Sequence, residues 1–198
     1  MKKLFKSVLL LAAAGTMTLG FGSCSDNNEE SGNGTNTATE EEVFLGKVLS
    51  NYVDATVNPT YKEMAIHAET LYAQLKALRD AVEQGNATEA QVKAACDSWK
   101  KARAAYESSE AFLMGAASDY NIDPHIDTWP LNLSSLHALL KGPGLAQYTT
   151  ADDADNINNA HDNLGNSLLG FHAIEFVIFR NGQPRAVSSF NNAFDDYN

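Results

Sequence analysis

The stretch "LLGFHAIEFVIF" spans residues 168–179, and ten of its twelve residues are apolar or glycine. This composition predicts a segment that is buried in the protein. The two exceptions, His172 and Glu175, stand near its middle. A buried imidazole or carboxylate is costly unless it is paired, hydrogen-bonded or bound to a metal. The stretch therefore predicts that His172 and Glu175 each have a specific partner.

The spacing of these residues adds a geometric expectation. His172 and Glu175 are three positions apart, which on a helix places them on one face, one turn apart. Gly170 precedes them, and glycine inside a helix costs about 1 kcal/mol relative to alanine. A glycine here indicates that another part of the chain packs close to the backbone, or that a ligand needs the space.

Three interpretations of the pair remain open from spacing alone. His172 and Glu175 suit zinc or iron as ligands, since bundles that bind two irons use a similar Glu-x-x-His spacing in the reverse order. They also suit a general acid/base pair, in which the carboxylate orients the imidazole. The third interpretation is a buried structural pair that is satisfied by Arg103 or another partner. The zinc-protease pattern H-E-x-x-H is absent from the chain.

Working outward, the chain is dominated by helical periodicity. Apolar residues in the segment 61–85 are spaced 4, 3, 4, 3 and 4, which predicts one buried helix stripe: Met64, Ala68, Leu71, Leu75, Leu78 and Val82. Pro59 suits the first turn of this helix and Gly85 its end, and an earlier helix is expected over 41–57. A further helix is expected from Thr88 to about Gly115, with a stripe formed by Val92, Cys96, Trp99, Ala102, Tyr106 and Leu113.

Charged residues interrupt the apolar face of this last helix. Arg103, Glu107 and Glu110 are separated by four and three residues and share one side of it. On their own they are typical of an exposed ion-pair stripe, which is common on helix surfaces. Their position beside Trp99 and Tyr106 leaves a role in a site as the alternative.

The second half of the chain is less regular. Residues 118–132 are expected to form a long irregular connection, because Pro124 and Pro130 break it and Asp and Asn supply turn chemistry. A short helix is expected over 133–140, and a long one from about residue 152 through the opening stretch to Arg180. The sequence "NGQPR" then turns the chain, and 186–198 are expected to begin another helix.

Composition limits the class of protein. The chain has 198 residues, 44% of them apolar, which is enough for one globular domain with a real core. No alternating strand pattern is present, so we expect an all-α, up-and-down helical bundle. The net charge of −11 repels nucleic acid and excludes that class of partner.

The N-terminus is typical of an exported protein. Three lysines, a short apolar run and small residues before Cys24 predict a signal peptide over 1–23, with Cys24 as a lipidation site that resembles a bacterial lipoprotein signal. Residues 24–42 are acidic and polar, which predicts a disordered tether before a folded domain over 43–198. Cys96 is expected to be a small apolar residue on a helix, with a disulfide to Cys24 as the alternative.

Three sequence blocks resemble the imelysin family. "GFHAIEF" (170–176) matches the family's G-x-H-x-x-E motif, "WKKARAAYESSEAFLMG" (99–115) resembles its W-x-x-x-R-x-x-Y-E-x-S-E-A-F signature, and "IDTWPLN" (126–132) resembles a block with Asp before Trp-Pro-Leu. The lipoprotein start and the acidic run are similar to those of Bacteroidetes members, in which such a run resembles a surface-export signal; a solvated spacer is the alternative. The resemblance implies an all-α fold, of which this chain covers the first of two bundle halves.

The resemblance also implies a set of functions and site residues. The first expectation is a cell-envelope lipoprotein, at the outer membrane or the cell surface, that binds iron for uptake with partner proteins of iron transport. The alternatives are a metallopeptidase, as the family name implies, and a non-catalytic binding or scaffold module. His172 and Glu175 are the implied ligands of an iron or zinc ion and the candidate catalytic residues. The implied site-lining residues are Arg103, Glu107, Glu110, Asp127, Trp129 and Gly170.

Overall fold

The computed structural model describes residues 38–149 and 154–191 of the chain, which divides into two units, 1–43 and 44–198. The predicted signal peptide and the lipidation site at Cys24 lie outside the described residues. Within the predicted tether, helix α2 (Glu40–Tyr52) begins at Glu40. Its start is fixed by Thr39, whose backbone N–H donates to the Glu42 carboxylate at 2.7 Å while its hydroxyl accepts from the Glu42 N–H at 3.2 Å.

The two helices predicted over 41–57 and 61–85 form one continuous helical segment. A π-helical turn, Val53–Val57, connects α2 to α3 (Asn58–Glu83), and the Asn58 N–H donates to the Val53 carbonyl oxygen. Pro59 lies directly after this turn. Because proline has no N–H to donate, a locally widened hydrogen-bond pattern lets the helix continue past it.

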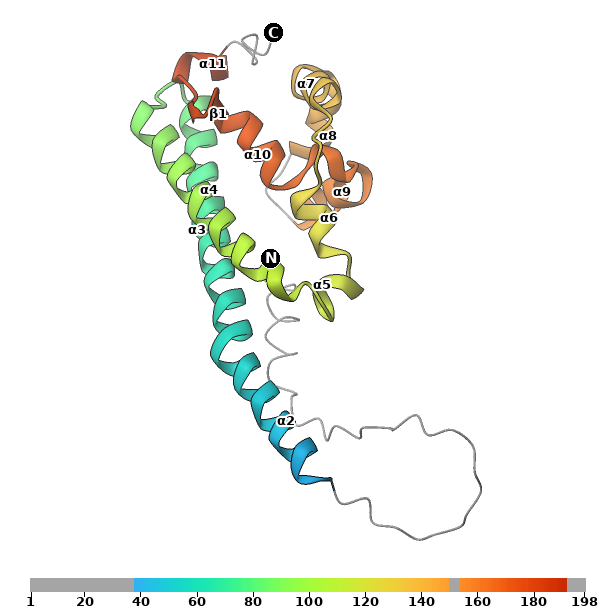
Figure 1. Ribbon diagram of the computed structural model, residues 1–198. Helices are drawn as coiled ribbons and strands as arrows, with labels where there is room; N and C mark the ends of the chain where they lie inside the picture. Colours follow the sequence, from blue (N-terminus) through green and yellow to red (C-terminus); the bar gives the residue numbers. More distant parts are fainter. Residues whose placement is uncertain (1–37, 150–153, 192–198) are drawn as a thin grey trace. The chain divides into compact units, whose positions relative to one another are not determined.

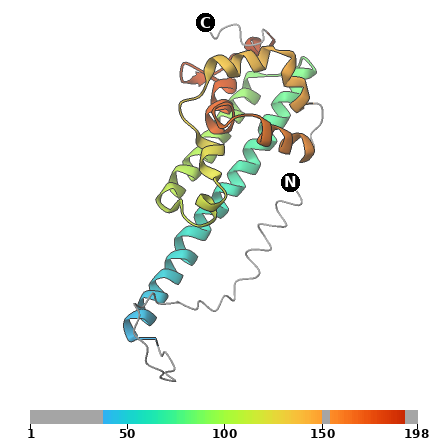
Figure 2. The same cartoon turned by 90° about the vertical axis from the view of Figure 1, so that its right-hand side faces the viewer.

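Helix α4 (Glu89–Ser109) packs along α3, as Figures 1 and 2 show. It begins as predicted at Thr88, which exchanges hydrogen bonds with Gln91 in a capping box. It ends earlier than predicted, since a 3₁₀ turn, Glu110–Phe112, follows it. The predicted stripes supply the core between the two helices, in which the buried members are Leu71, Leu78, Val92, Cys96, Ala102 and Tyr106. Cys96 is a free, buried thiol.

The connection predicted to be irregular contains two short helices, α5 (Ala116–Asp119) and α6 (Ile122–Asp127). Asn121 adopts a left-handed conformation (φ 51°) that turns the chain between them. Pro124 is tolerated because it lies in the first turn of α6, where backbone N–H groups have no partner within the helix. The prediction of an irregular segment was therefore wrong for these residues.

The predicted helix over 133–140 is confirmed as α7 (Leu133–Lys141), and a 3₁₀ turn (Pro143–Leu145) and α8 (Ala146–Thr149) follow it. The long helix predicted from 152 to 180 was wrong. The chain instead forms α9 (Ala154–Asn163), a 3₁₀ turn (Asn166–Leu168) and α10 (Gly170–Ile178). The break follows from extended backbone at Leu169 and a left-handed φ of 76° at Gly170.

After α10 the chain turns as predicted at "NGQPR", but through a small hairpin that the sequence analysis did not expect. Strand β1 (Phe179–Arg180) pairs antiparallel with β2 (Gln183–Pro184), and α11 (Val187–Asn191) follows. Asn181 and Gly182, with φ of 52° and 73°, form the connecting turn. Two positive φ angles at an Asn-Gly pair are the signature of a type I′ hairpin turn.

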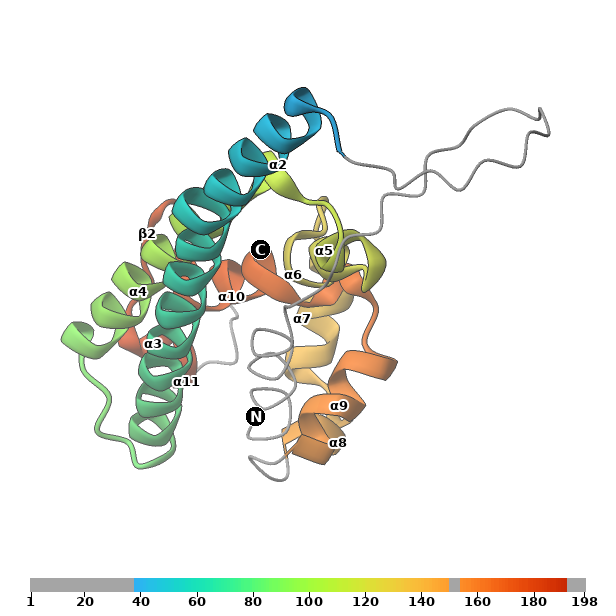
Figure 3. The same ribbon diagram turned by 90° about the horizontal axis from the view of Figure 1, so that it is seen from below.

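Helix α10 occupies the position that matters for function. It packs against α4 on one side and α6 on the other, so that it lies between the α3–α4 pair and the short helices α5–α9 (Figures 1 and 3). The all-α bundle predicted from sequence is confirmed. Among the described residues, no helix combines the length and the apolar character that crossing a membrane requires.

Candidate functional site

The site begins with a close approach between Gly170 and α6. A Cβ atom placed on Gly170 would lie 2.3 Å from the Ile126 carbonyl oxygen, well inside any real contact distance. The expected close packing at this glycine is therefore present, although Gly170 opens α10 instead of lying inside a long helix. Because Asp127 follows Ile126 directly, this contact brings the end of α6 beside the first turn of α10.

A second set of contacts fixes α10 to α4. The Trp99 indole Nε1–H donates to the Phe171 carbonyl oxygen at 2.9 Å. The Phe171 ring packs edge-on against Trp99 and tilted against Tyr106, with centroids 6.1 and 5.5 Å away. The residue before His172 is thus held by both its backbone and its side chain, which sets where the imidazole emerges.

The His172 imidazole lies between two carboxylates. Its Nδ1 is 3.3 Å from Glu175 Oε2, and its Nε2 is 3.3 Å from Asp127 Oδ1. The Asp127 side chain is 12% exposed, whereas that of Glu175 is 47% exposed. The two nitrogens therefore face different environments: Nε2 faces a buried carboxylate and Nδ1 faces one that is open to solvent.

Arg103 compensates the charge of the buried carboxylate. Its guanidinium forms an ion pair with Asp127 and a second one with Glu107, at 2.5 Å between Nη2 and Oε1. Its central carbon also lies 5.3 Å from the Tyr106 ring centre and 5.5 Å from that of Phe171. The salt bridges and the ring contacts together hold Arg103 in one orientation. Side-chain contacts therefore run without a gap from Arg103 through Asp127 and His172 to Glu175.

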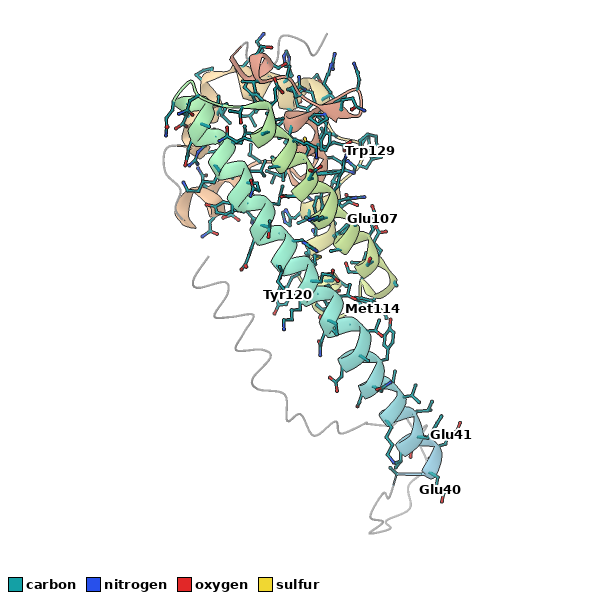
Figure 4. The ribbon with its side chains drawn as sticks, turned by 90° about the vertical axis from the view of Figure 1, so that its left-hand side faces the viewer. Glu40, Glu41, Glu107, Met114, Tyr120 and Trp129 are labelled. Atoms are coloured by element: carbon teal, nitrogen blue, oxygen red, sulfur yellow. The ribbon has the colours of Figure 1, made fainter. Side chains whose placement is uncertain are left out.

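Of the remaining predicted site residues in the described chain, Trp129 contacts His172 and Glu110 does not. The Trp129 ring lies 4.7 Å from the His172 ring, is 70% exposed, and projects on the same side of the molecule as Glu107 in Figure 4. Glu110 is exposed, and the neighbouring Glu107 carboxylate, as a hydrogen-bonding partner, raises the pKa of Glu110. No contact joins Glu110 to His172 in the described chain.

Sequence reasoning placed Tyr106 in the core stripe of its helix but missed the partner of this tyrosine, Asp123, and it also missed Arg185. The buried Tyr106 hydroxyl donates to Asp123, and burial followed by this hydrogen bond raises the pKa of Tyr106. Arg185 is buried at the C-terminal end of α10. The aspartate lay within a segment expected to be irregular, and nothing in the spacing around Arg185 indicated a partner.

His125 lies in the same segment, 118–132, as Asp127. It does not join the network by any contact in the described chain. Its ring stacks on that of His161, with centroids 4.2 Å apart. The Nδ1 atom of His125 is buried and has no hydrogen-bond partner among the described residues.

The donor set fits part of a metal site. Two ligand atoms that each lie about 2.1 Å from a metal stand about 3.0–3.4 Å apart at tetrahedral or octahedral angles, and His172 Nδ1 and Glu175 Oε2 are 3.3 Å apart. Asp127 on the other ring nitrogen matches the carboxylate that commonly orients a metal-binding histidine. Within residues 38–149 and 154–191, no group of three or more His, Cys, Asp and Glu side chains could hold a metal ion. The described residues thus offer one pair of donor atoms at a separation that a metal ion could bridge.

Comparisons with known proteins identify one family whose members have two kinds of name. The model of the imelysin family (Peptidase M75) matches residues 57–196. Iron-regulated protein A of Synechococcus elongatus is 27% identical over 144 residues, which cover 73% of this chain and 34% of that protein. The chain is thus similar both to a family described by peptidase activity and to a protein named for its regulation by iron.

Two solved structures are similar in fold and sequence. An imelysin peptidase from Bacteroides ovatus has a TM-score of 0.59 and 33% identity, covering 73% of this chain and 39% of that one. A putative iron-regulated protein A precursor from Parabacteroides distasonis has a TM-score of 0.59 and 28% identity, covering 80% and 42%. The chain spans less than half the length of each of these three proteins.

Proposed function

The chain belongs to the imelysin family, and we propose that it is a cell-envelope lipoprotein that binds iron for uptake, with His172 and Glu175 as ligands. The observation that carries the proposal is the 3.3 Å separation of His172 Nδ1 and Glu175 Oε2 on an open face of α10. The relative named iron-regulated protein A supports iron as the metal. Zinc, which accepts the same donor atoms, is the competing ion.

The other residues of the network have roles that follow from their contacts. Asp127 Oδ1 lies 3.3 Å from His172 Nε2, so this carboxylate would favour the tautomer that carries its proton on Nε2 and would leave Nδ1 to bind the ion together with Glu175. Arg103 holds the Asp127 side chain in place through their ion pair. Trp129 packs against the imidazole with ring centres 4.7 Å apart and would limit the movement of the ring. The remaining coordination positions of the cargo ion would be filled by water or by groups beyond the described residues.

The test is a thermal melt of the protein with and without Fe²⁺, Fe³⁺ and Zn²⁺, because a ligand that binds only the folded state raises the melting temperature. We expect a rise with iron that is lost in His172→Ala and in Glu175→Gln. His67→Ala is the matched control, since His67 also lies beside a glutamate one helical turn away, with Nε2 3.6 Å from Glu63 Oε1. An equal rise in the wild type and in His172→Ala would contradict the proposal.

A metallopeptidase is the second candidate, and the similarity to an imelysin peptidase of known structure favours it. In that case Glu175 would act as ligand or general base, and the metal would activate a water molecule. Cleavage of an unstructured polypeptide that is abolished by chelation and by Glu175→Gln would support a peptidase. Cleavage that survives both treatments would argue against it.

The proposed location is supported by the sequence of the N-terminus. Lipid attached at Cys24 would anchor the protein without a membrane-spanning segment. We expect the protein in the outer-membrane fraction, with its iron site available to partner proteins of iron transport. Metabolic labelling with palmitate should mark the wild type and leave Cys24→Ala unlabelled; label on Cys24→Ala would refute the anchor.

A further inference from the structure

Arg185 is the largest fully buried side chain among the described residues, at 1% exposure. It follows β2 directly, at the end of the hairpin that returns the chain to α10. A guanidinium stays charged in proteins and has five N–H donors, so its burial requires a matching set of acceptors. The last carbonyl groups of α10 are among these acceptors.

The final four carbonyl oxygens of a helix have no partner within it. In α10 the Glu175 oxygen accepts from the Phe179 N–H, which closes the last turn. The other three oxygens accept from Arg185: Phe176 from Nη2 at 2.8 Å, Val177 from Nε at 3.1 Å and Ile178 from the backbone N–H at 2.9 Å. One residue thus completes the end of the helix.

The chemistry of this contact is favourable in two further respects. A cation at the C-terminal end of a helix interacts well with the helix dipole. The guanidinium carbon also lies 5.7 Å from the centre of the Phe176 ring, which adds a cation–π contact. Arg185 therefore holds the end of α10 by charge as well as by hydrogen-bond geometry.

We propose that Arg185 is a positioning residue that holds Glu175 beside His172. Glu175 begins the turn whose carbonyl oxygens Arg185 binds, and α10 has only nine residues. The start of the helix has its own contacts, at Gly170 and Phe171. Loss of Arg185 would therefore release the turn that bears Glu175 while His172 stays in place. This proposal rests on the proposed metal site, but its geometric part can be tested without metal.

The experiment compares Arg185→Met, Arg185→Lys and the control Arg180→Met in the otherwise unchanged protein. Arg180 lies in the same hairpin and has the same charge. Three quantities are measured: hydrogen exchange of the amides of residues 176–179, the ¹⁵N chemical shift of His172 Nδ1, and the iron-induced rise in melting temperature. Glu175→Gln provides the reference ¹⁵N shift for a His172 imidazole that has lost the carboxylate beside Nδ1.

For Arg185→Met we expect exchange in 176–179 to accelerate about tenfold or more, while exchange in α3 and α4 is unchanged. The Nδ1 shift should move toward the Glu175→Gln value, and the iron-induced rise should be lost. A lysine brings the charge but not the planar fork of donors, so Arg185→Lys should move the Nδ1 shift part of the way. Arg180→Met should match the wild type.

A wild-type Nδ1 shift in Arg185→Met would overturn the proposal even if exchange accelerated, because Arg185 would then only stabilise the fold. If Arg185→Met does not fold, an unchanged Nδ1 shift in Arg185→Lys overturns it in the same way. Absence of an iron response in the wild type would refute the proposed function alone, since the exchange and nitrogen measurements still decide the role of Arg185.

Discussion

Gly170 and Ile126 approach so closely that no side chain fits between them: a Cβ at residue 170 would stand 2.3 Å from the Ile126 carbonyl oxygen. The contact joins the start of α10 to the end of α6. It brings together two residues that are far apart in sequence, with His172 Nε2 3.3 Å from Asp127 Oδ1. The glycine of the motif thus acts through backbone contact.

Gly170→Ala should be strongly destabilising. The new methyl group meets backbone instead of a flexible side chain, and φ at this position is 76°. The left-handed conformation alone costs about 1–2 kcal/mol for alanine, and overpacking adds about 1–3 kcal/mol. Urea denaturation checks this, with Gly182→Ala as the control, because Gly182 has φ of 73° and nothing within 4 Å of its Cβ position. Equal losses in the two variants would show that the Ile126 contact is unimportant.

Removal of Arg103 should leave Asp127 as a buried charge without its main counter-charge. The Asp127 side chain is 12% exposed, and breaking such a pair costs about 3–5 kcal/mol when burial is complete, so we expect about 2–4 kcal/mol for Arg103→Met. Glu107→Gln removes the exposed partner of the same arginine and should change stability by less than about 1 kcal/mol. Denaturant titration of both variants and of Arg103→Met/Asp127→Asn measures the coupling; a similar loss in both single variants would contradict this assignment.

The two tryptophans should respond differently to the same change. Trp99→Phe removes the indole donor to the Phe171 carbonyl oxygen, which lies 2.9 Å from Nε1, and loss of one such hydrogen bond costs about 0.5–1.5 kcal/mol. Trp129→Phe alters a side chain that is 70% exposed and should change the free energy of unfolding by about 0.5 kcal/mol or less. If both variants unfold at the same urea concentration, the Trp99 hydrogen bond does not anchor α10.

The buried Cys96 thiol should make stability depend on pH in the alkaline range. Burial raises the pKa of Cys96 from its usual value near 9 to about 11. Because the folded pKa is the higher one, the stabilisation is fully present below pH 9 and is lost as pH rises through 11. The difference in free energy of unfolding between the wild type and Cys96→Ser should therefore shrink over this interval. The buried Tyr106 titrates in both proteins, so its contribution cancels in this difference. A difference in free energy of unfolding that stays constant from pH 9 to 11 would refute the raised pKa of Cys96.

Cys96 should also be unreactive at neutral pH in the folded protein. The thiolate is the nucleophile, and the Cys96 Sγ donates a hydrogen bond to the Ile178 carbonyl oxygen at 3.3 Å. Iodoacetamide labelling, followed at the peptide that contains Cys96, should be at least about tenfold slower in buffer than in urea. Labelling at the same rate in both conditions would show that the end of α10 does not cover this thiol.

Much of the fold could be predicted from local patterns. The 4-3 spacing of apolar residues identified α3 and α4, the capping residue Thr88 identified the start of α4, and three sequence blocks identified the family. His172 and Glu175 are neighbours on α10 as their spacing indicated, with Nδ1 and Oε2 3.3 Å apart. Each of these features depends on residues within a few helical turns of one another.

The sequence alone therefore determined which segments are helical over long stretches and which residues share a helix face, because helix geometry fixes both. Tertiary structure decided the rest: the left-handed Gly170 that divides the expected long helix, the Asp127–Arg103 pair behind His172, and the Arg185 guanidinium at the end of α10. Each of these involves partners from separate elements. Their burial and charge compensation exist only once the elements have packed, so no local pattern in the sequence encodes them.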